Sequence, residues 1–261
     1  MCLAPAAALF AAFWLLPMAR LALLPADKGW ATYLAVLTEP RYLTSLLQTT
    51  TLSLAVTAVS LLLAAAVGLH LGRHRFVGRR LLLSLLTLPM SFPGVIVGFF
   101  VILIGGRQGP FADLTEWLAG SRVTFAYSVA GLFIAYVYFS LPRAIAAFSA
   151  AAERLEPQLE EAARSLGATR WQVARDVWLP ALGPTAVAAG AILFATAMGA
   201  FGTAFTLASR FEVLPITIYN EFTNYANFAL AASLSLALGL MTWAVLFLAR
   251  CFGPAQSGAG A

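Results

Sequence analysis

Six long apolar blocks, separated by short polar segments, constrain this chain more than any other feature of its sequence. They cover residues 6–24, 43–71, 81–104, 123–148, 181–207 and 228–248. About 20 apolar residues in a helix span the hydrocarbon core of a bilayer. Lipid offers the backbone no water to bind, so each block must satisfy its N–H and C=O groups within a helix. The sequence therefore predicts an all-α integral membrane protein, with six transmembrane helices in a single domain over residues 1–261.

The charge content agrees with this interpretation. Only 10% of the residues are charged and 61% are hydrophobic, whereas a soluble domain carries about 25% charged residues. The chain has too few charges to coat a soluble globule. Its net charge of +5 comes from arginines at the ends of the apolar blocks. This placement indicates contact with anionic lipid and an orientation signal, and does not favour a nucleic-acid site.

The first block, residues 6–24, lies where a secretory signal peptide would lie. However, no Lys or Arg precedes it, and Pro17, Met18 and Arg20 form a poor small-residue cleavage site. We therefore interpret the block as a retained span, with Arg20 near its outer end.

The distribution of basic residues predicts the orientation of the six spans. With both termini in the cytoplasm, the cytoplasmic side receives Arg73, Arg75, Arg79, Arg80, Arg143, Arg154, Arg164, Arg170, Arg175 and Arg250. The external side then receives half as many, namely Lys28, Arg41, Arg107, Arg122 and Arg210. Positive residues are enriched in cytoplasmic loops, so we expect cytoplasmic N- and C-termini.

We expect a polar connection over residues 25–42, a turn at Thr49 to Thr51 before the second span, and an external loop over residues 210–225. Residues 105–122 should form an external segment with a short amphipathic piece. The small residues of the tail, 253–261, are typical of disorder.

Two blocks contain residues that could shape a translocation pathway. Pro89 and Pro93 interrupt the third block just before Gly94, and two such prolines should bend a helix. The bend could form a gate or merely a kinked packing helix. In the fifth block Gly199 and Gly202 flank Phe201, which could line a narrow path, although tight helix packing is the favoured interpretation. Gly68 and Gly72 in the second block also predict close helix packing.

The polar segment 153–180 has the signals of two short helices. Pro157 suits the first turn of a helix, and an apolar stripe follows at helical spacing over Leu159, Ala162, Ala163 and Leu166. Gly167 is placed just beyond the helix end, where a left-handed residue is needed. Thr169 can cap a second helix, and Pro180 should end it.

The spacing within this segment resembles a known motif. Glu161-Ala162-Ala163, then Gly167, then Val177 and Leu179-Pro180 stand at the intervals of the EAA loop of ABC importer permeases. Val177 replaces the commoner Ile of that motif. Residues 88–94 and 105–109 are similar to the permeases of the sulfate, molybdate, polyamine, iron and phosphonate group.

The resemblance implies a type I permease fold in the inner membrane of a bacterial cell, and a pathway for a small solute brought by an external binding protein. It implies a second permease subunit, identical or paralogous, and a cytoplasmic ATPase dimer that docks on the EAA loop. ATP and Mg would then bind to the ATPase, and this chain would need no cofactor of its own. The solute itself is not indicated.

The sequence lacks the motifs of an enzyme. It has no phosphate-binding loop, no nucleophile elbow and no zinc-binding His pair with a Glu. His70 and His74 are only two ligands, and Cys2 and Cys251 lie near opposite ends, so we expect no metal site and no catalytic residue.

An ion-coupled transporter or a channel subunit is the alternative. A coupled transporter would need Asp, Glu or Lys within a span, and the blocks contain none. A membrane-embedded enzyme is a weaker alternative, because its acidic candidates Asp113, Glu116, Glu212 and Glu221 are scattered.

Overall fold

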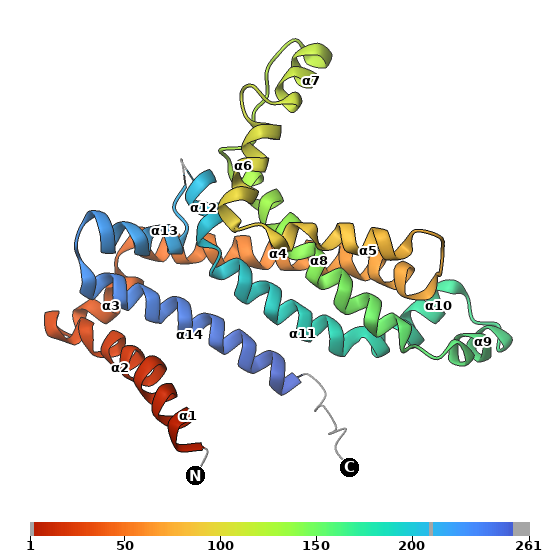
Figure 1. The fold of residues 1–261 in the computed structure, drawn as a ribbon, viewed down its shortest axis with the longest axis horizontal. Helices are drawn as coiled ribbons and strands as arrows, with labels where there is room; N and C mark the ends of the chain where they lie inside the picture. Colours follow the sequence, from red (N-terminus) through yellow and green to blue (C-terminus); the bar gives the residue numbers. More distant parts are fainter. Residues whose placement is uncertain (1–2, 209–210, 253–261) are drawn as a thin grey trace. The chain divides into compact units, whose positions relative to one another are not determined.

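The computed structural model describes residues 3–208 and 211–252, and every regular element in these ranges is a helix (Figure 1). The predicted tail, residues 253–261, and Arg210 of the predicted external loop lie outside the described residues. The described chain divides into two compact units, one from residues up to 51 and from 212–242, the other from 52–211 and from 243 onward. Two long helices, α4 (Pro40–Arg73) and α14 (Phe228–Phe252), contribute to both units.

Six helical stretches of the described residues are long and apolar enough to cross a membrane. They are Pro5–Lys28, Pro40–Arg73, Gly94–Ala119, Val129–Glu153, Arg170–Met198 and Phe228–Cys251. Their number and order agree with the six apolar blocks. Their ends differ from the predicted ones, most of all in the third, fourth and fifth stretches.

The first unit surrounds a small apolar core. Its elements are α1 (Leu3–Phe10), a π-helical turn (Ala11–Leu15), α2 (Leu16–Leu23), a 3₁₀ turn (Leu24–Lys28), α3 (Ala31–Thr38), the first part of α4, α13 (Leu214–Tyr219), a second π-helical turn (Asn220–Asn224) and most of α14. Val36, Leu46, Leu214, Leu230 and Leu234 form the core. The predicted connection 25–42 and loop 210–225 are thus largely helical, because their apolar side chains pack on this core.

The predicted turn at Thr49 to Thr51 is wrong, because all three residues lie inside α4. Each threonine hydroxyl donates to the carbonyl four residues earlier, for example Thr49 Oγ1 to the oxygen of Ser45 at 2.7 Å. A threonine can lie within a membrane-spanning helix when its hydroxyl donates a hydrogen bond to a carbonyl of the same helix. Thr49 Oγ1 also accepts a hydrogen bond from the backbone N–H of Leu214 at 2.7 Å, which fixes the start of α13.

The second unit holds the candidate site. It consists of the remainder of α4, α5 (Arg79–Thr87), a 3₁₀ turn (Leu88–Ser91), α6 (Gly94–Gly105), α7 (Pro110–Ala119), α8 (Val129–Glu153), α9 (Pro157–Ser165), α10 (Arg170–Val173), a π-helical turn (Ala174–Trp178), α11 (Leu179–Met198), α12 (Phe201–Leu207) and the end of α14. Its core draws on α4, α8 and α11 and includes Leu71, Ile145, Phe148 and Leu193.

The predicted close packing at Gly68 and Gly72 is present. A Cβ atom added to Gly68 would lie 2.6 Å from the Cβ of Phe148, and one added to Gly72 would lie 2.6 Å from that of Ala152. Carbon atoms in contact stand about 3.5–4 Å apart. These glycines therefore let α4 approach α8 more closely than any larger residue would allow.

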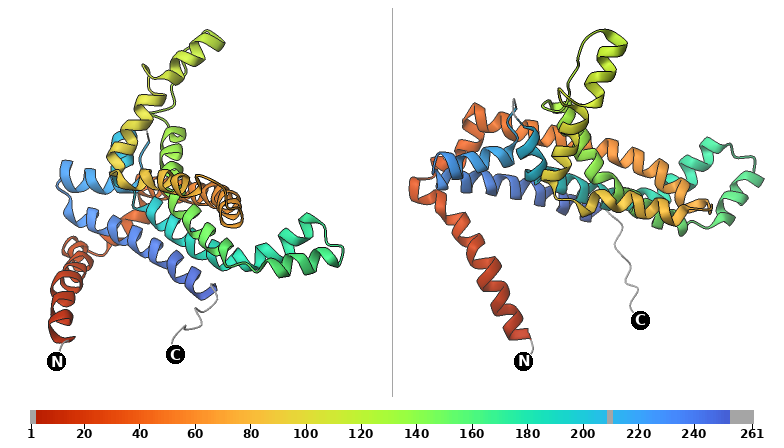
Figure 2. Two further views of the ribbon diagram at one scale, coloured as in Figure 1. Left: turned by 45° about the vertical axis from the view of Figure 1, so that its right-hand side comes forward. Right: turned by 45° about the horizontal axis from the view of Figure 1, so that its top comes forward.

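The third apolar block bends where the prolines predict. Helix α5 ends at Thr87, a 3₁₀ turn carries Pro89, and Phe92 is extended before α6 begins at Gly94. Pro93 cannot donate a hydrogen bond and disfavours helix in the residue before it, which explains the extended Phe92. Beyond the break, α6 packs on α8 and α12, and α7 follows at its far end (Figure 2). The stretch that could span a membrane accordingly begins at Gly94.

Pro180 does not end the second helix of the polar segment, which is a correction to the sequence interpretation. α10, the π-helical turn and α11 form one helical stretch over Arg170–Met198, with Pro180 in the first turn of α11 and Pro184 inside it. A proline clashes with the carbonyl four residues earlier in a regular helix. The wider π turn immediately before Leu179 relieves that clash, so the helix continues into the membrane-spanning part.

Candidate functional site

The polar segment forms a helix, a tight turn and a second helix at one end of the second unit (Figure 1). Pro157 occupies the first turn of α9, as the sequence predicts. Glu161, Ala162 and Ala163 lie on α9 and Gly167 lies in the turn. Val177 lies in the π-helical turn, and Leu179 and Pro180 begin α11. The EAA-like residues thus extend from an exposed helix to the base of a membrane-spanning one.

Gly167 ends α9 in the left-handed conformation, with φ +85°. Its N–H donates to the carbonyl of Arg164 at 2.9 Å, and the N–H of Ala168 donates to that of Ala163 at 3.0 Å. This pair of bonds is the Schellman arrangement, which satisfies the last carbonyls of a helix. A Cβ on Gly167 would meet no atom within 4 Å. Backbone conformation, and not lack of space, therefore requires glycine here.

Thr169 fixes the start of the second helix. Its hydroxyl accepts a hydrogen bond from the N–H of Gln172 at 3.3 Å, and its own N–H donates to Gln172 Oε1 at 2.7 Å. This reciprocal capping box satisfies two N–H groups that have no partner within the helix. The turn is therefore held on both sides by hydrogen bonds that involve few residues.

The outer surface of the segment is apolar and accessible. The side chains of Leu159, Leu166 and Trp171 are 56%, 89% and 75% exposed, and Glu161 and Ala162 are also exposed. No other part of the described chain covers these side chains. Exposed apolar groups beside a few charges are typical of a protein–protein contact.

The inner side of the segment is anchored by charge. Glu160, which is 8% exposed, forms ion pairs with Arg73 of α4 and, at 2.6 Å, with Arg164 of its own helix. The guanidinium of Arg73 also lies 5.4 Å from the ring centre of Trp178, a cation–π contact. The sequence did not indicate this anchor, because nothing in it distinguishes which of the two adjacent glutamates, Glu160 or Glu161, faces the protein.

The predicted pathway residues separate into two groups. Gly94, Gly199 and Gly202 line one cavity of about 240 Å³ between α6, α8, α11 and α12. Pro89, Pro93 and Phe201 are not among its lining residues. Pro89 is buried in the 3₁₀ turn, Pro93 is exposed, and the ring of Phe201 lies 5.3 Å from that of Phe205.

Close helix contacts form one wall of this cavity. The hydroxyl of Thr203 on α12 donates to the carbonyl of Gly94 on α6 at 3.0 Å. A Cβ on Gly94 would lie 2.9 Å from that hydroxyl oxygen, and one on Gly98 would collide with Thr206. Across the cavity, the hydroxyl of Tyr136 on α8 donates to the carbonyl of Ala200 at 2.6 Å, in the break between α11 and α12. The carbonyl freed by the helix break is thus satisfied by a side chain.

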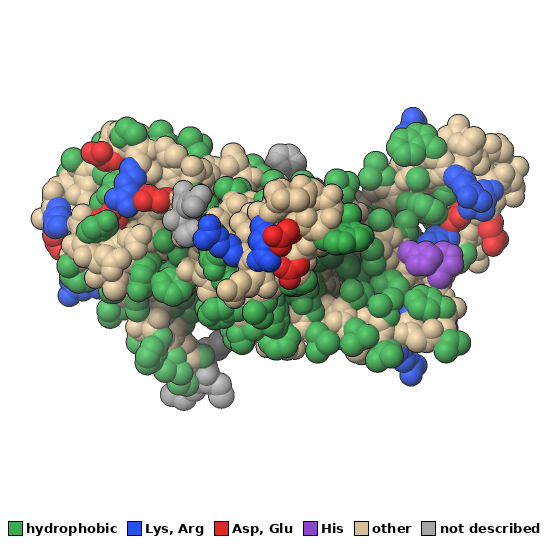
Figure 3. All heavy atoms as spheres, turned by 90° about the horizontal axis from the view of Figure 1, so that it is seen from above, with side chains coloured by type: hydrophobic (Ala, Val, Ile, Leu, Met, Phe, Trp, Pro, Cys, Tyr) green, Lys and Arg blue, Asp and Glu red, His purple; other side chains and the backbone are tan. Residues whose placement is uncertain are grey.

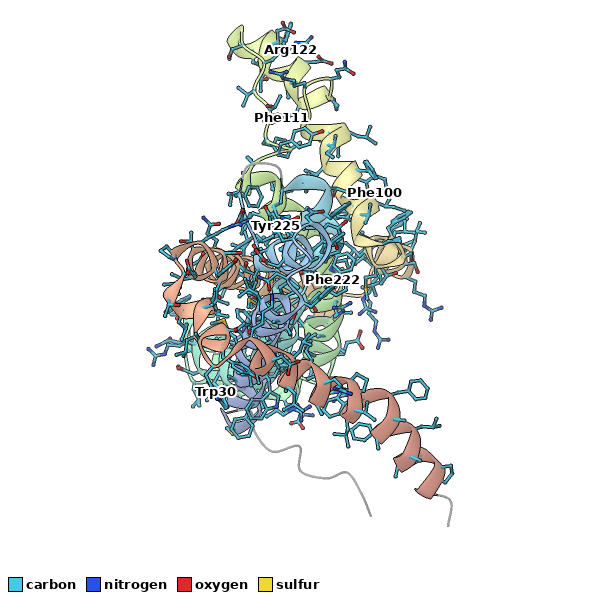
Figure 4. All side chains as sticks on the ribbon, turned by 90° about the vertical axis from the view of Figure 1, so that its left-hand side faces the viewer. Trp30, Phe100, Phe111, Arg122, Phe222 and Tyr225 are labelled. Atoms are coloured by element: carbon cyan, nitrogen blue, oxygen red, sulfur yellow. The ribbon has the colours of Figure 1, made fainter. Side chains whose placement is uncertain are left out.

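The acidic residues of the weaker enzyme alternative are paired. On α7, Asp113 and Glu116 both contact Arg122, at 3.3 Å and 2.7 Å, near the tip of the projection that carries Phe111 (Figure 4). The hydrogen bond with Glu116 raises the pKa of Arg122. In the first unit, Arg41 binds Glu212 at 2.9 Å and lies 4.0 Å from Glu221. All four acidic residues of that alternative are therefore engaged in contacts with arginine.

The surface agrees with a membrane setting. In the view from above, hydrophobic side chains cover much of the visible face and the charged ones gather in a few groups (Figure 3). Many of the large apolar side chains on the spans are exposed, including Phe13, Leu62, Leu103, Leu240 and Trp243. Lipid is the solvent that such a surface requires.

Comparisons with known proteins identify the family. The sequence profile of the family described as "Binding-protein-dependent transport system inner membrane component" matches residues 64–256. The sulfate transport system permease protein CysT of Escherichia coli is 32% identical over 92% of this chain and 88% of its own length. The molybdenum transport system permease protein ModB of the same species is 34% identical over 67% of this chain and 75% of its own.

Solved structures show the same fold at low sequence identity. A chain of a bacterial alginate ABC transporter, in complex with an alginate-bound periplasmic protein, superposes with a TM-score of 0.82 at 19% identity, covering 100% of this chain and 95% of its own. A chain of the MetNI methionine ABC transporter superposes with a TM-score of 0.58 at 20% identity, covering 84% of this chain and 98% of its own. The chain therefore belongs to the family of binding-protein-dependent transport system inner membrane components, and it is a multi-pass permease subunit of an ABC importer.

Proposed function

We propose that this permease carries a small tetrahedral oxyanion of the sulfate and molybdate class across the inner membrane. The observation that carries the proposal is the 32% identity to a sulfate permease over 92% of the chain. A molybdenum permease is similarly close over a shorter stretch. Sulfate and molybdate share charge and tetrahedral shape, so one pathway chemistry suits both.

The proposed importer has three kinds of component. Two permease subunits, identical or paralogous, form the pathway, and an external binding protein delivers the solute. A cytoplasmic ATPase dimer docks on the surface of Leu159, Glu161, Ala162, Leu166 and Trp171, which is exposed and has a fixed conformation. ATP and Mg bind to the ATPase, and this chain holds no cofactor.

Uptake into proteoliposomes tests the substrate. The permease is reconstituted with its ATPase and binding protein, and the uptake of labelled sulfate and molybdate is compared with that of methionine and an alginate oligosaccharide. ATP-dependent uptake of one or both oxyanions alone is expected. Uptake of the amino acid or the sugar with no oxyanion uptake would overturn the proposed substrate.

The orientation is a further part of the proposal, with both termini in the cytoplasm. It places position 75 inside and position 113 outside. In a variant with Cys2 and Cys251 replaced by serine, an impermeant thiol reagent added to intact spheroplasts should label Asp113→Cys and not Arg75→Cys. Labelling only at position 75 would reverse the topology and would place the proposed docking surface on the wrong side for a cytoplasmic ATPase.

A further inference from the structure

An arginine lies inside a membrane-spanning helix. The orientation predicted from the sequence counts Arg143 on the cytoplasmic side, but α8 continues through Pro142 and Arg143 to Glu153. At 1.5 Å per residue, about 15 Å of helix follow Arg143 and about 21 Å precede it. A charged residue at such a position is costly and generally has a functional partner.

No carboxylate neutralises Arg143 among the described residues. Its side chain is half-buried, and its one hydrogen bond there runs from Nη1 to Thr196 Oγ1 on α11, at 3.2 Å. Five other arginines of the second unit do form ion pairs, namely Arg73, Arg79, Arg122, Arg164 and Arg175. A guanidinium has five N–H donors, so most of the hydrogen-bonding capacity of Arg143 is unused.

The cavity of about 240 Å³ is linked to this guanidinium through Thr196, although Arg143 is not itself a lining residue. Thr196, which binds Arg143, contributes to the cavity lining, as do Tyr136 and Ser140. Tyr136, Ser140 and Arg143 stand seven and three residues apart on α8, so they share one face of the helix. Liquid water takes about 30 Å³ per molecule. The cavity therefore has room for a small tetrahedral oxyanion and a few waters.

The hydroxyl groups that line the cavity differ in whether they already donate a hydrogen bond. Those of Tyr136, Thr196 and Thr203 already donate to the carbonyls of Ala200, Ile192 and Gly94. Ser140 is 2% exposed, and no hydrogen-bond partner is recorded for its hydroxyl within the described part of the chain. An anion binds donors, and the free side-chain donors in this region include the Ser140 hydroxyl and the remaining N–H groups of Arg143.

We infer that Arg143 and Ser140 form a transit contact for the oxyanion within the permease, with Thr196 as the residue that positions the guanidinium. The inference rests on the proposed oxyanion substrate. The guanidinium supplies a positive charge and paired donors that match two oxygens of the anion. The contact is made by a single arginine and one hydroxyl, so it favours entry without holding the anion too tightly to leave.

Transport by the complete importer provides the first test. Loss of a charged hydrogen bond corresponds to about a tenfold or larger change. We therefore expect Arg143→Gln to lower oxyanion uptake about tenfold or more, and Arg143→Lys to lower it less. Thr196→Val should have an intermediate effect that a higher solute concentration partly restores. ATP hydrolysis stimulated by the loaded binding protein should stay near the wild-type rate in all three variants.

Arg80→Gln is the matched control, because Arg80 is an exposed arginine of α5 without an ion pair among the described residues. It should keep uptake within about twofold of wild type. Full oxyanion uptake by Arg143→Gln would overturn the inference while leaving the proposed substrate intact. Absence of oxyanion uptake by the wild-type importer would instead refute the proposed substrate.

Chemical labelling tests the cavity without transport. In the variant that lacks Cys2 and Cys251, Ser140→Cys is treated with an anionic and a cationic methanethiosulfonate of similar size. We expect the anionic reagent to react faster, the preference to disappear with Arg143→Gln, and free sulfate or molybdate to slow the reaction. An unchanged preference in Arg143→Gln would overturn the inference.

The same assay in nanodiscs separates a solute from a lipid headgroup as the anion at this site. Protection by free oxyanion in purely zwitterionic lipid supports the inference. Protection that requires anionic lipid and is not given by free oxyanion would mean that Arg143 binds headgroups, and would also overturn it.

Discussion

Glycine is required for opposite reasons in two regions of the second unit. In the turn of residues 153–180, the proposed coupling segment, Gly167 has φ +85° and open space around its Cα. At the crossing of α4 and α8, Gly72 has an ordinary helical backbone, but an added Cβ would lie 2.6 Å from the Cβ of Ala152 and 2.7 Å from the carbonyl oxygen of Ser149. The first glycine sets the direction of the chain, and the second sets the distance between helices. Substitutions at the two sites should therefore fail in different ways.

The largest effect should come from Gly72→Ala. The added methyl group meets backbone and a Cβ atom, neither of which can rotate away, so α4 and α8 must separate along their crossing. Overpacking a close contact costs about 1–3 kcal/mol. We expect a strong loss of protein from the membrane fraction, measured by quantitative immunoblotting.

Gly183→Ala is the control for this change, because Gly183 lies in α11 and a Cβ there meets nothing within 4 Å. It should accumulate like wild type. Equal amounts of the two variants would show that the α4–α8 crossing does not depend on close approach.

Gly167→Val should abolish coupling and leave the amount of protein near normal. A side chain in the left-handed conformation costs about 1–2 kcal/mol, and the chain can avoid this cost by changing the turn between α9 and α10. Uptake should fall about tenfold or more. The amount of ATPase that is recovered with the permease in a pull-down should fall as well. Gly167→Asn should be milder, because Asn tolerates this conformation.

Gly78→Val tests whether strain alone explains the result. Gly78 has φ +90° and open space, but it lies in the short loop before α5. This variant should keep its ATPase and its uptake. If it lost both as severely as Gly167→Val, the coupling segment would have no special role in binding the ATPase.

Glu161→Lys should have the smallest effect of the three. Glu161 is exposed in the middle of α9, so its replacement reverses one charge on the proposed docking surface. We expect ATPase association to weaken by a few-fold to about tenfold, measured by titration of the ATPase against the reconstituted permease. Glu156→Lys makes the same charge change at the N-cap of α9. Equal weakening by both would indicate an effect on the helix end and not a contact at Glu161.

Local signals in the sequence predicted local structure well. Gly167 and Thr169 specify the turn of the coupling segment through hydrogen bonds between residues only a few positions apart. The bend at Pro89 and Pro93 likewise follows from the missing N–H and the steric demands of proline. Pro180 does not end its helix, because the π-helical turn just before it relieves the clash between the proline ring and the preceding turn. No residue type marks such a turn in the sequence.

Hydrophobic block length and short-range spacing were enough to predict a helical membrane protein with six spans and an EAA-like polar segment, because both signals lie within short stretches of sequence. Tertiary structure alone decided that Glu160, and not Glu161, anchors the segment on Arg73. It also decided that Arg143 of α8 binds Thr196, a lining residue of a cavity formed by four helices. Both outcomes depend on which face of a helix meets a helix distant in sequence, and this is set by packing over the whole unit.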